Sequence, residues 1–279
     1  MSKRQWLKID VDAVLRERLP RYYRFIPKFL ISWLKREICQ DEMNGMLSRA
    51  DGLEGAQFCR SVLDYLHVSY DIKGESHMPP PDDHKVTYVC NHPLGGLDGM
   101  ALIEMITAHH GIEPYFVVND LLMAIEPLRK VFVPVNTHGR QSRRGTAGIE
   151  DAFASDRPVI VFPAGLVSRK GKGGRIADLR WRKSFVNLSV KYRRDIIPMY
   201  FDGRNSGTFY EMARTRERLG LKFNFEMIRL PREVMLSRGK KYTIHVGKRI
   251  PVSRLQGGRR ADDEALAVRK IVYNLKKDI

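Results

Sequence analysis

A histidine and a carboxylate stand six residues apart in the stretch 91–99, which reads Asn-His-Pro-Leu-Gly-Gly-Leu-Asp-Gly. The stretch follows an apolar run typical of a strand, Val86 to Cys90, and precedes a helical pattern that begins at Met100. Open α/β sheets place their chemistry at this carboxyl-terminal edge of the strands. If Asp98 accepts from one ring nitrogen of His92, it fixes the tautomer and leaves the other nitrogen free as a base.

This pair suits direct removal of a proton from an acceptor hydroxyl, because the same turn contains no Ser or Cys nucleophile. A purely structural role is the alternative. In that case His92 only ends a strand and Asp98 only caps the helix that follows. The spacing by itself leaves both interpretations open.

A second candidate site is the stretch 162–169, Phe-Pro-Ala-Gly-Leu-Val-Ser-Arg, which closes the apolar strand-like run 159–162. A Pro-x-Gly turn after a buried strand exposes backbone N–H groups that can hold an anion or a developing oxyanion. Residues 169–183 then carry seven basic residues and one acidic residue, with three glycines between them. Such a loop suits a phosphate or an acidic head group, whereas a solvated surface loop is the alternative.

Polar residues also follow the strand-like run 196–201, again at the predicted active edge of the sheet. Asn205 or Ser206 would cap the next helix. Arg204 would meet a carboxylate or phosphate of an acceptor molecule.

These sites are positioned by apolar runs that alternate with helical patterns. Strands are expected at 68–72, 86–90, 115–118, 132–135, 159–162, 196–201 and 242–246. Helices are expected at 55–66, 100–110, 120–129, 143–154, 178–193, 206–219 and 262–277. Strands that alternate with helices predict an α/β fold with a largely parallel mixed sheet flanked by helices.

The first forty residues differ from the rest of the chain. Residues 1–38 hold ten Lys or Arg against four Asp or Glu, interleaved with aromatic side chains, and a helical apolar stripe runs from Pro27 to Ile38. Basic residues beside such a stripe describe a helix that lies in a membrane interface. A helix packed on the main domain, with its charges solvated, is the alternative. We predict a basic amphipathic docking segment at residues 1–50 and an α/β domain at residues 51–279.

The composition indicates a folded protein with an anionic partner. The net charge of +17 suits a membrane surface, an acidic carrier protein, a phosphate-bearing ligand or nucleic acid, although no nucleic-acid fold signature is present. No apolar run approaches the roughly 18 residues that span a bilayer, and no secretory signal is evident. Three widely spaced cysteines fit reduced thiols, and no histidine has partners at metal-ligand spacing. We therefore predict a peripheral protein without a metal on the cytoplasmic face of the inner membrane.

The motifs in their order resemble the glycerolipid acyltransferase superfamily, which includes the 1-acylglycerol-3-phosphate acyltransferases. The resemblance covers roughly residues 80 to 205 and rests on Asn91-His92 with Asp98, on Phe162-Pro163-Ala164-Gly165 and on Ile197-Pro198-Met199. It implies that His92 is the base and that Asp98 orients it. The resemblance and the turn composition together give a set of expected substrate-binding residues, which are Asn91, Gly95, Gly96, Phe162, Pro163, Gly165, Ser168, Arg169, Arg204 and Asn205.

Two departures from the superfamily pattern bear on the acceptor. The His–Asp spacing has one extra residue, which the Gly95-Gly96 pair would absorb by bulging. Ala164 replaces the Glu of the third motif, and Leu166-Val167 replaces its Thr-Arg, so the residues that normally place a glycerol-phosphate acceptor are missing. This version resembles a hemolysin-annotated branch with similarity to bacterial O-acyltransferases that complete ornithine or glycine aminolipids.

We therefore expect an O-acyltransferase that moves a fatty acyl chain from acyl carrier protein or coenzyme A to a lyso-aminolipid. The acceptor would be an N-acyl amino acid whose fatty chain bears a 3-hydroxyl, and no other cofactor is expected. The first alternative is a lysophosphatidate acyltransferase. The alternatives of another class are a membrane-perturbing protein and a basic binding protein without catalysis.

Overall fold

The computed structural model describes residues 7–135, 143–221 and 223–276. Its centre is a seven-stranded sheet in the order β1-β9-β8-β2-β5-β3-β4. The strands are β1 (Ser69–Lys73), β2 (Val86–Cys90), β3 (Tyr115–Asn119), β4 (Phe132–Val135), β5 (Val159–Val161), β8 (Asp195–Asp202) and β9 (Lys241–Val246). All neighbours pair in parallel except β8 and β9, which are antiparallel. The prediction of an α/β fold with a largely parallel mixed sheet is therefore confirmed.

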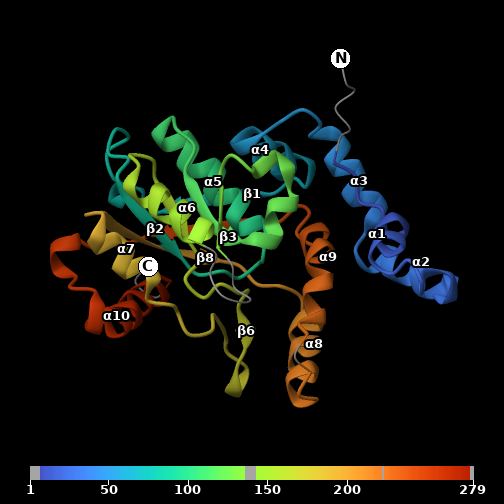
Figure 1. Ribbon diagram of the computed structural model, residues 1–279. Coiled ribbons are helices and arrows are strands. Elements are labelled where there is room, and N and C mark those ends of the chain that lie inside the picture. The colour runs from blue at the N-terminus through green and yellow to red at the C-terminus, as the bar shows by residue number, and fades with distance from the viewer. Residues whose placement is uncertain (1–6, 136–142, 222, 277–279) are drawn as a thin grey trace.

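Helices cover both faces of this sheet (Figure 1). On one face α4 (Gly55–Tyr65) and α5 (Leu97–His110) bury side chains such as Phe58 and Leu102 in the larger core cluster. The helices on the other face are α6 (Arg143–Ala154), α7 (Ser184–Lys191) and α10 (Ala261–Asn274), which form a second cluster around Phe153 and Phe185. Burial on both sides explains why the central strands read as continuous apolar runs rather than alternating ones.

Strand β2 positions the first motif. Each of its five residues is buried, and it lies between β8 and β5, to which it pairs in parallel. The carboxyl ends of these three neighbouring strands therefore meet at one edge of the sheet, where the chain leaves β2 at Asn91. A short two-stranded ribbon of β6 (Arg169–Lys170) and β7 (Ile176–Ala177) follows β5 at the same edge.

Two of the predicted helices are corrected by the structure. Residues 120–129 form the short 3₁₀ helices η3 (Asp120–Ala124) and η4 (Glu126–Leu128) instead of one α-helix, because Pro127 disfavours the α conformation in the residue before it. The helix predicted at 178–193 begins only at Ser184. Residues 178–183 are irregular because Asp178 and Trp181 are buried at the active edge.

Three helices precede the main domain along the chain, namely α1 (Val11–Arg18), α2 (Lys28–Glu37) and α3 (Gln40–Arg49). Helix α3 packs Met46 and Leu47 into the larger core cluster. Helix α2 instead leaves Phe29 75% exposed. The boundary at residue 50 stays a prediction. Among the residues that the structure describes, no helix combines the length and apolarity needed to cross a bilayer.

The last part of the chain before β9 forms a separate layer that extends from the sheet near β6 (Figure 1). It consists of α8 (Gly207–Arg218), the 3₁₀ helix η6 (Phe225–Arg229) and α9 (Leu230–Met235). The remaining 3₁₀ helices are η1 (Tyr23–Phe25), η2 (Glu75–His77), η5 (Lys172–Gly174), η7 (Val252–Arg254) and η8 (Gly258–Arg260).

Candidate active site

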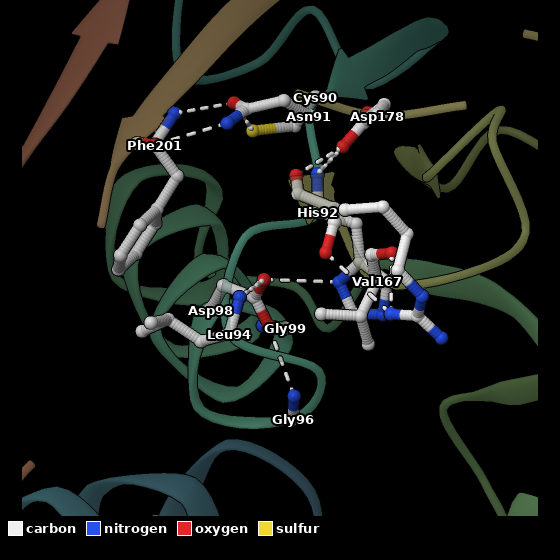
Figure 2. Close-up of polar contacts among 12 residues, drawn as sticks. Cys90, Asn91, His92, Leu94, Gly96, Asp98, Gly99, Val167, Asp178 and Phe201 are labelled. Carbon is white, nitrogen blue, oxygen red and sulfur yellow. Dashed lines mark hydrogen bonds and ion pairs between the residues drawn. The ribbon is translucent and has the colours of Figure 1, made fainter. Parts of the chain in front are cut away.

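His92 and Asp98 face each other at the end of β2. The Nδ1 atom of His92 lies 2.9 Å from the Oδ2 atom of Asp98, and Figure 2 shows this contact directly. His92 is the second residue after β2, whereas Asp98 is the second residue of α5. The turn between them therefore bends back far enough to pair two side chains that are six residues apart.

Asp98 is fully buried, yet its environment favours the charged form. Its Oδ1 atom accepts from the N–H groups of Gly96 and Gly99 at 3.1 and 3.0 Å, and Oδ2 accepts from Leu94 N–H at 2.9 Å. Burial by itself would raise the pKa of Asp98, but the charge and hydrogen bond of His92 and these backbone donors outweigh it, so that its pKa lies below the ordinary value. Asp98 is thus an anion held in place before any substrate arrives.

His92 is held at its backbone and at its ring. Its N–H donates to Asp178 Oδ1 at 3.2 Å, and its carbonyl accepts from Ser168 N–H at 2.8 Å. The imidazole stacks on Phe162, with ring centroids 4.2 Å apart and planes inclined by 25°. The side chain keeps 17% of its surface exposed. Together with the Asp98 contact, these interactions fix the ring while one edge stays accessible.

The extra residue between His92 and Asp98 is absorbed as the sequence predicted. Gly95 has φ +87°, a left-handed conformation that only glycine adopts easily. A Cβ atom on Gly95 would also lie 2.7 Å from side-chain carbons of both Val167 and Leu230. The turn is therefore packed between the end of the β5 motif and α9, and any larger residue at position 95 would displace it.

The match of the chain to known sequences agrees with this geometry. Residues 13–279 match the family described as Acyltransferase. The chain belongs to this acyltransferase family. The prediction of an enzyme that transfers acyl groups is therefore confirmed.

Two curated proteins are similar to this acyltransferase over nearly its whole length. Both are described as lyso-glycine lipid O-acyltransferases, one from Phocaeicola vulgatus and one from Bacteroides thetaiotaomicron. Each is 39% identical over 267 residues, which cover 96% of this chain and 95% and 97% of the two relatives. A crystal structure of the 1-acyl-sn-glycerophosphate (LPA) acyltransferase PlsC from Thermotoga maritima aligns with a TM-score of 0.47 and 12% identity, covering 95% of this chain and 97% of that one.

The turn at residues 162–165 of the acyltransferase forms the wall beside His92. Gly165 has φ +66°, and its N–H donates to the Phe162 carbonyl at 3.0 Å, which closes a tight turn through Pro163. The N–H of Gly96 is likewise bound to Asp98. Among the three glycines expected to bind substrate, Gly165 and Gly96 thus have their N–H groups already bonded within their turns, which leaves Gly95 as the candidate donor to an oxyanion.

Asn91 joins two strands at this edge. Its Oδ1 atom accepts from the Phe201 N–H at 2.7 Å, and its Nδ2 atom donates to the Phe201 carbonyl at 3.0 Å (Figure 2). These bonds hold the end of β2 against β8. The structure therefore gives Asn91 a positioning role, and the predicted contact with substrate stays a prediction.

Arg169 lies at the predicted edge, but its guanidinium points into the protein. The residue is only 6% exposed and pairs with Glu226 at 2.9 Å, while it also donates to the Val167 carbonyl. Burial lowers the pKa of Arg169, and the charge of Glu226 opposes that effect. The charge predicted to bind a head group is thus neutralised inside the α8–η6 layer.

The remaining predicted residues follow either β8 or the turn after β5. Arg204 is exposed after β8, and Ser206 caps α8 by accepting from the Phe209 N–H at 3.2 Å, as predicted. Asn205 is buried, and its Nδ2 atom finds no acceptor among the described residues. The Ser168 hydroxyl donates to Asp178 at 2.6 Å, which makes it part of the support of His92. Within the described ranges, His, Cys, Asp and Glu side chains form no cluster of three suited to a metal ion.

The sequence analysis did not predict Asp178, which binds residues from three segments at this edge of the sheet. Its carboxylate accepts from the His92 N–H, from the Ser168 hydroxyl and, at 2.9 Å, from Trp181 Nε1. Its own N–H donates to the Tyr273 hydroxyl on α10 at 2.7 Å. Burial raises the pKa of Asp178, although these hydrogen bonds oppose the rise. The only sequence signal was a single acid within a run of seven basic residues.

Proposed function

We propose that this acyltransferase transfers a fatty acyl chain from an acyl thioester to the hydroxyl of a lyso-aminolipid, an N-acyl amino acid with a 3-hydroxy fatty chain. The names of the two relatives support this acceptor. Ala164 and Leu166-Val167 also support it, since they lack the charges that would place a glycerol phosphate. Lysophosphatidate is therefore the less favoured acceptor.

The contact between His92 and Asp98 is the observation that carries this proposal. Because Nδ1–H donates to a buried carboxylate, Nε2 carries the lone pair and can act as the base. His92 takes the proton of the acceptor hydroxyl while that oxygen forms a bond to the thioester carbonyl carbon. The carbon–sulfur bond then breaks, and the imidazolium returns the proton to the leaving thiolate. Asp98 stabilises the imidazolium during this cycle.

The donor is an acyl thioester of acyl carrier protein or coenzyme A, and both are anionic. Arg182 is exposed beside the second motif. Its guanidinium lies 3.8 Å from the position that a Cβ atom would take on Gly165, and the backbone N–H of Arg182 donates to the Pro163 carbonyl at 2.9 Å. In this arrangement Arg182 binds a phosphate of the donor or the carboxylate of the acceptor, and Arg204 binds the other.

The acceptor lies in a membrane, so the enzyme must reach the lipid surface. Phe25, Phe29 and Trp33 are 68%, 75% and 47% exposed along η1 and α2. Large apolar side chains among exposed basic residues are typical of interfacial docking. In our proposal this segment anchors the enzyme peripherally to an anionic membrane, at its cytoplasmic face.

The proposed function is tested by supplying purified protein with defined substrates. Lyso-glycine lipid and lysophosphatidate are offered separately in detergent micelles, each with palmitoyl-acyl carrier protein or palmitoyl-coenzyme A. We expect an ester product from the lyso-glycine lipid and at least about 10-fold less from lysophosphatidate. The motif lacks the charged residues that would pair with a glycerol phosphate, and an unpaired phosphate costs more than about 1 kcal/mol of binding free energy. Preferential acylation of lysophosphatidate would contradict the proposal. The His92→Ala variant controls for acylation without the base.

A further inference from the structure

A second apolar surface lies far along the chain from the N-terminal segment. Three large apolar residues, Leu219, Leu221 and Phe223, follow the end of α8, and a fourth, Ile228, lies in η6. The four are called the α8–η6 cluster below. They are 66%, 47%, 71% and 37% exposed. Large exposed apolar side chains that gather in one short stretch of chain mark a place of contact. We propose that the α8–η6 cluster is a second membrane contact, which enters the interfacial region of an anionic lipid bilayer.

The charge around the cluster fits an anionic lipid surface. Residues 207–240 contain eight Lys or Arg against four Asp or Glu. Glu226 and Glu233 are buried, and they pair with Arg216 at 3.1 Å and with Arg229 at 4.0 Å, two cations that are themselves largely buried. Arg214 and Arg218, by contrast, are exposed on α8 next to Leu219. Apolar side chains flanked by arginines are the combination that anchors proteins to anionic bilayers.

The layer that bears the cluster also contacts the catalytic turn. Leu230 and Met227 pack against the buried side chains of Val167 and Phe209. Leu230 and Val167 are the residues that enclose Gly95, in the turn between His92 and Asp98. The layer therefore connects the exposed cluster to the turn at which a lipid hydroxyl must arrive. A membrane contact here brings the lipid surface next to the catalytic turn.

The same layer is fastened to the N-terminal helices by ion pairs. Glu37, at the end of α2, pairs with Arg229 and with Arg232, the latter at 3.3 Å. Glu37 is almost fully buried, so the pair with Arg229 is shielded from solvent. Figure 1 shows α2 and α9 on the same side of the sheet. The two apolar surfaces are thus linked, and together they set the orientation of the enzyme on the membrane.

This inference rests on the proposed function for its lipid substrate, but its test does not need that substrate. A triple variant, Leu219→Ser, Leu221→Ser and Phe223→Ser, removes most of the α8–η6 cluster. The matched control replaces Leu179, Leu266 and Ile271 with Ser. These residues are also exposed, but Leu266 and Ile271 belong to α10, and Leu179 lines a pocket with Leu266. Helix α10 lies on the other side of the protein from α8 (Figure 1). Flotation with vesicles of phosphatidylglycerol and phosphatidylethanolamine measures binding without any lysolipid.

We expect the triple variant to bind these vesicles about 10- to 100-fold more weakly than the wild type, because interfacial burial of apolar groups drives such binding. The control variant should bind like the wild type. Equal binding by the triple variant, or an equal loss in the control, overturns the proposal. A concentration-dependent dimer that the triple variant loses would assign the cluster to a second copy of the chain and would overturn it too.

A fluorescence measurement locates the cluster directly. Phe223→Trp in a Trp33→Phe background is compared with the Trp33→Phe parent on vesicles of brominated lipid. We expect extra quenching and a blue shift from position 223, and unquenched emission there overturns the proposal. Acyl transfer to lyso-glycine lipid in micelles is assayed in parallel. If the wild type binds vesicles but transfers no acyl group to lyso-glycine lipid, the proposed function is contradicted, whereas the proposal of a membrane contact is not affected.

Discussion

The catalytic edge and the two exposed apolar surfaces are built on opposite principles. At the edge, Asp98 is fully buried and bound by three backbone N–H groups and by His92. At the surfaces, Phe29 and Phe223 are more than two-thirds exposed. Both carboxylate oxygens of Asp98 and the backbone of His92 have hydrogen-bond partners inside the protein, whereas the apolar side chains at the surface lack a comparable packed environment.

This difference separates what the two regions contribute to acyl transfer. A general base acts only if its geometry is fixed before the reaction, so the catalytic edge is pre-organised. A membrane contact acts by leaving water, so its side chains stay exposed until the lipid is present. Changes at the edge should therefore alter turnover, and changes at the surfaces should alter membrane binding.

The largest expected effect is that of His92→Ala on turnover. Loss of the base should lower kcat by about 10²- to 10⁴-fold. Vesicle binding should stay unchanged, because His92 is not one of the exposed apolar residues of either surface. Flotation and a product assay on the same preparation check both statements. A variant with near-normal kcat and intact folding would show that His92 is not the base.

Asp178→Ala should lower kcat by about 10²-fold, because it leaves the His92 N–H, the Ser168 hydroxyl and the Trp181 N–H without their acceptor. The KM for the acyl thioester should change little, which separates positioning from substrate binding. Asp178→Asn keeps one acceptor oxygen and should fall between. Glu104→Gln, a change at another buried acid, serves as the control. A loss confined to KM would refute the positioning role.

Phe25→Ser, Phe29→Ser and Trp33→Ser together should weaken vesicle binding by about 10- to 100-fold through loss of apolar burial. Turnover of the acceptor in detergent micelles should stay near the wild-type value, since these side chains are exposed and make none of the contacts that hold His92. The α10 control variant described above distinguishes this loss from a general effect of removing surface apolar groups. A lower kcat in micelles with unchanged vesicle binding would contradict this prediction, because it would show that these residues affect turnover and not membrane binding.

The smallest effect concerns stability against pH. The pKa of Asp98 is lowered in the folded protein, so its carboxylate stabilises the fold at pH values above the ordinary pKa of about 3.9, and that contribution is lost as the pH falls through the lowered value. Urea unfolding of wild type and Asp98→Asn should differ by a constant amount of about 1 to 3 kcal/mol between about pH 7 and pH 5. The difference should shrink below about pH 4. A difference that grows on acidification would contradict the assignment.

The contrast also explains how much the sequence could predict. Strands such as β2 and β8 were predicted because burial on both faces imposes apolar runs that are local in the chain. The His92–Asp98 pair was predicted because both residues lie in one turn, and Gly95 marks its bulge. Asp178 was assigned to a helix instead, since its contact with His92 joins residues that are 86 positions apart.

Arg169 illustrates the same limit on charged residues. Its sequence context, a run of cations and glycines, predicted an exposed anion site. The buried partner Glu226 lies 57 residues further along the chain, and no local sequence pattern predicts that its segment packs against Arg169. The α8–η6 cluster was missed for a related reason, because the exposure of Leu219 and Phe223 depends on how the segment after α8 packs on the rest of the protein.

The central claim is that His92 and Asp98 act as one unit, and a double-mutant cycle on kcat tests it most directly. His92→Ala, Asp98→Asn and the double variant are compared with wild type in micelles, with circular dichroism to confirm folding. If Asp98 acts through His92, the double variant should be as slow as His92→Ala alone, within about 3-fold. Losses that multiply in the double variant would show that the two residues act independently and would contradict the account.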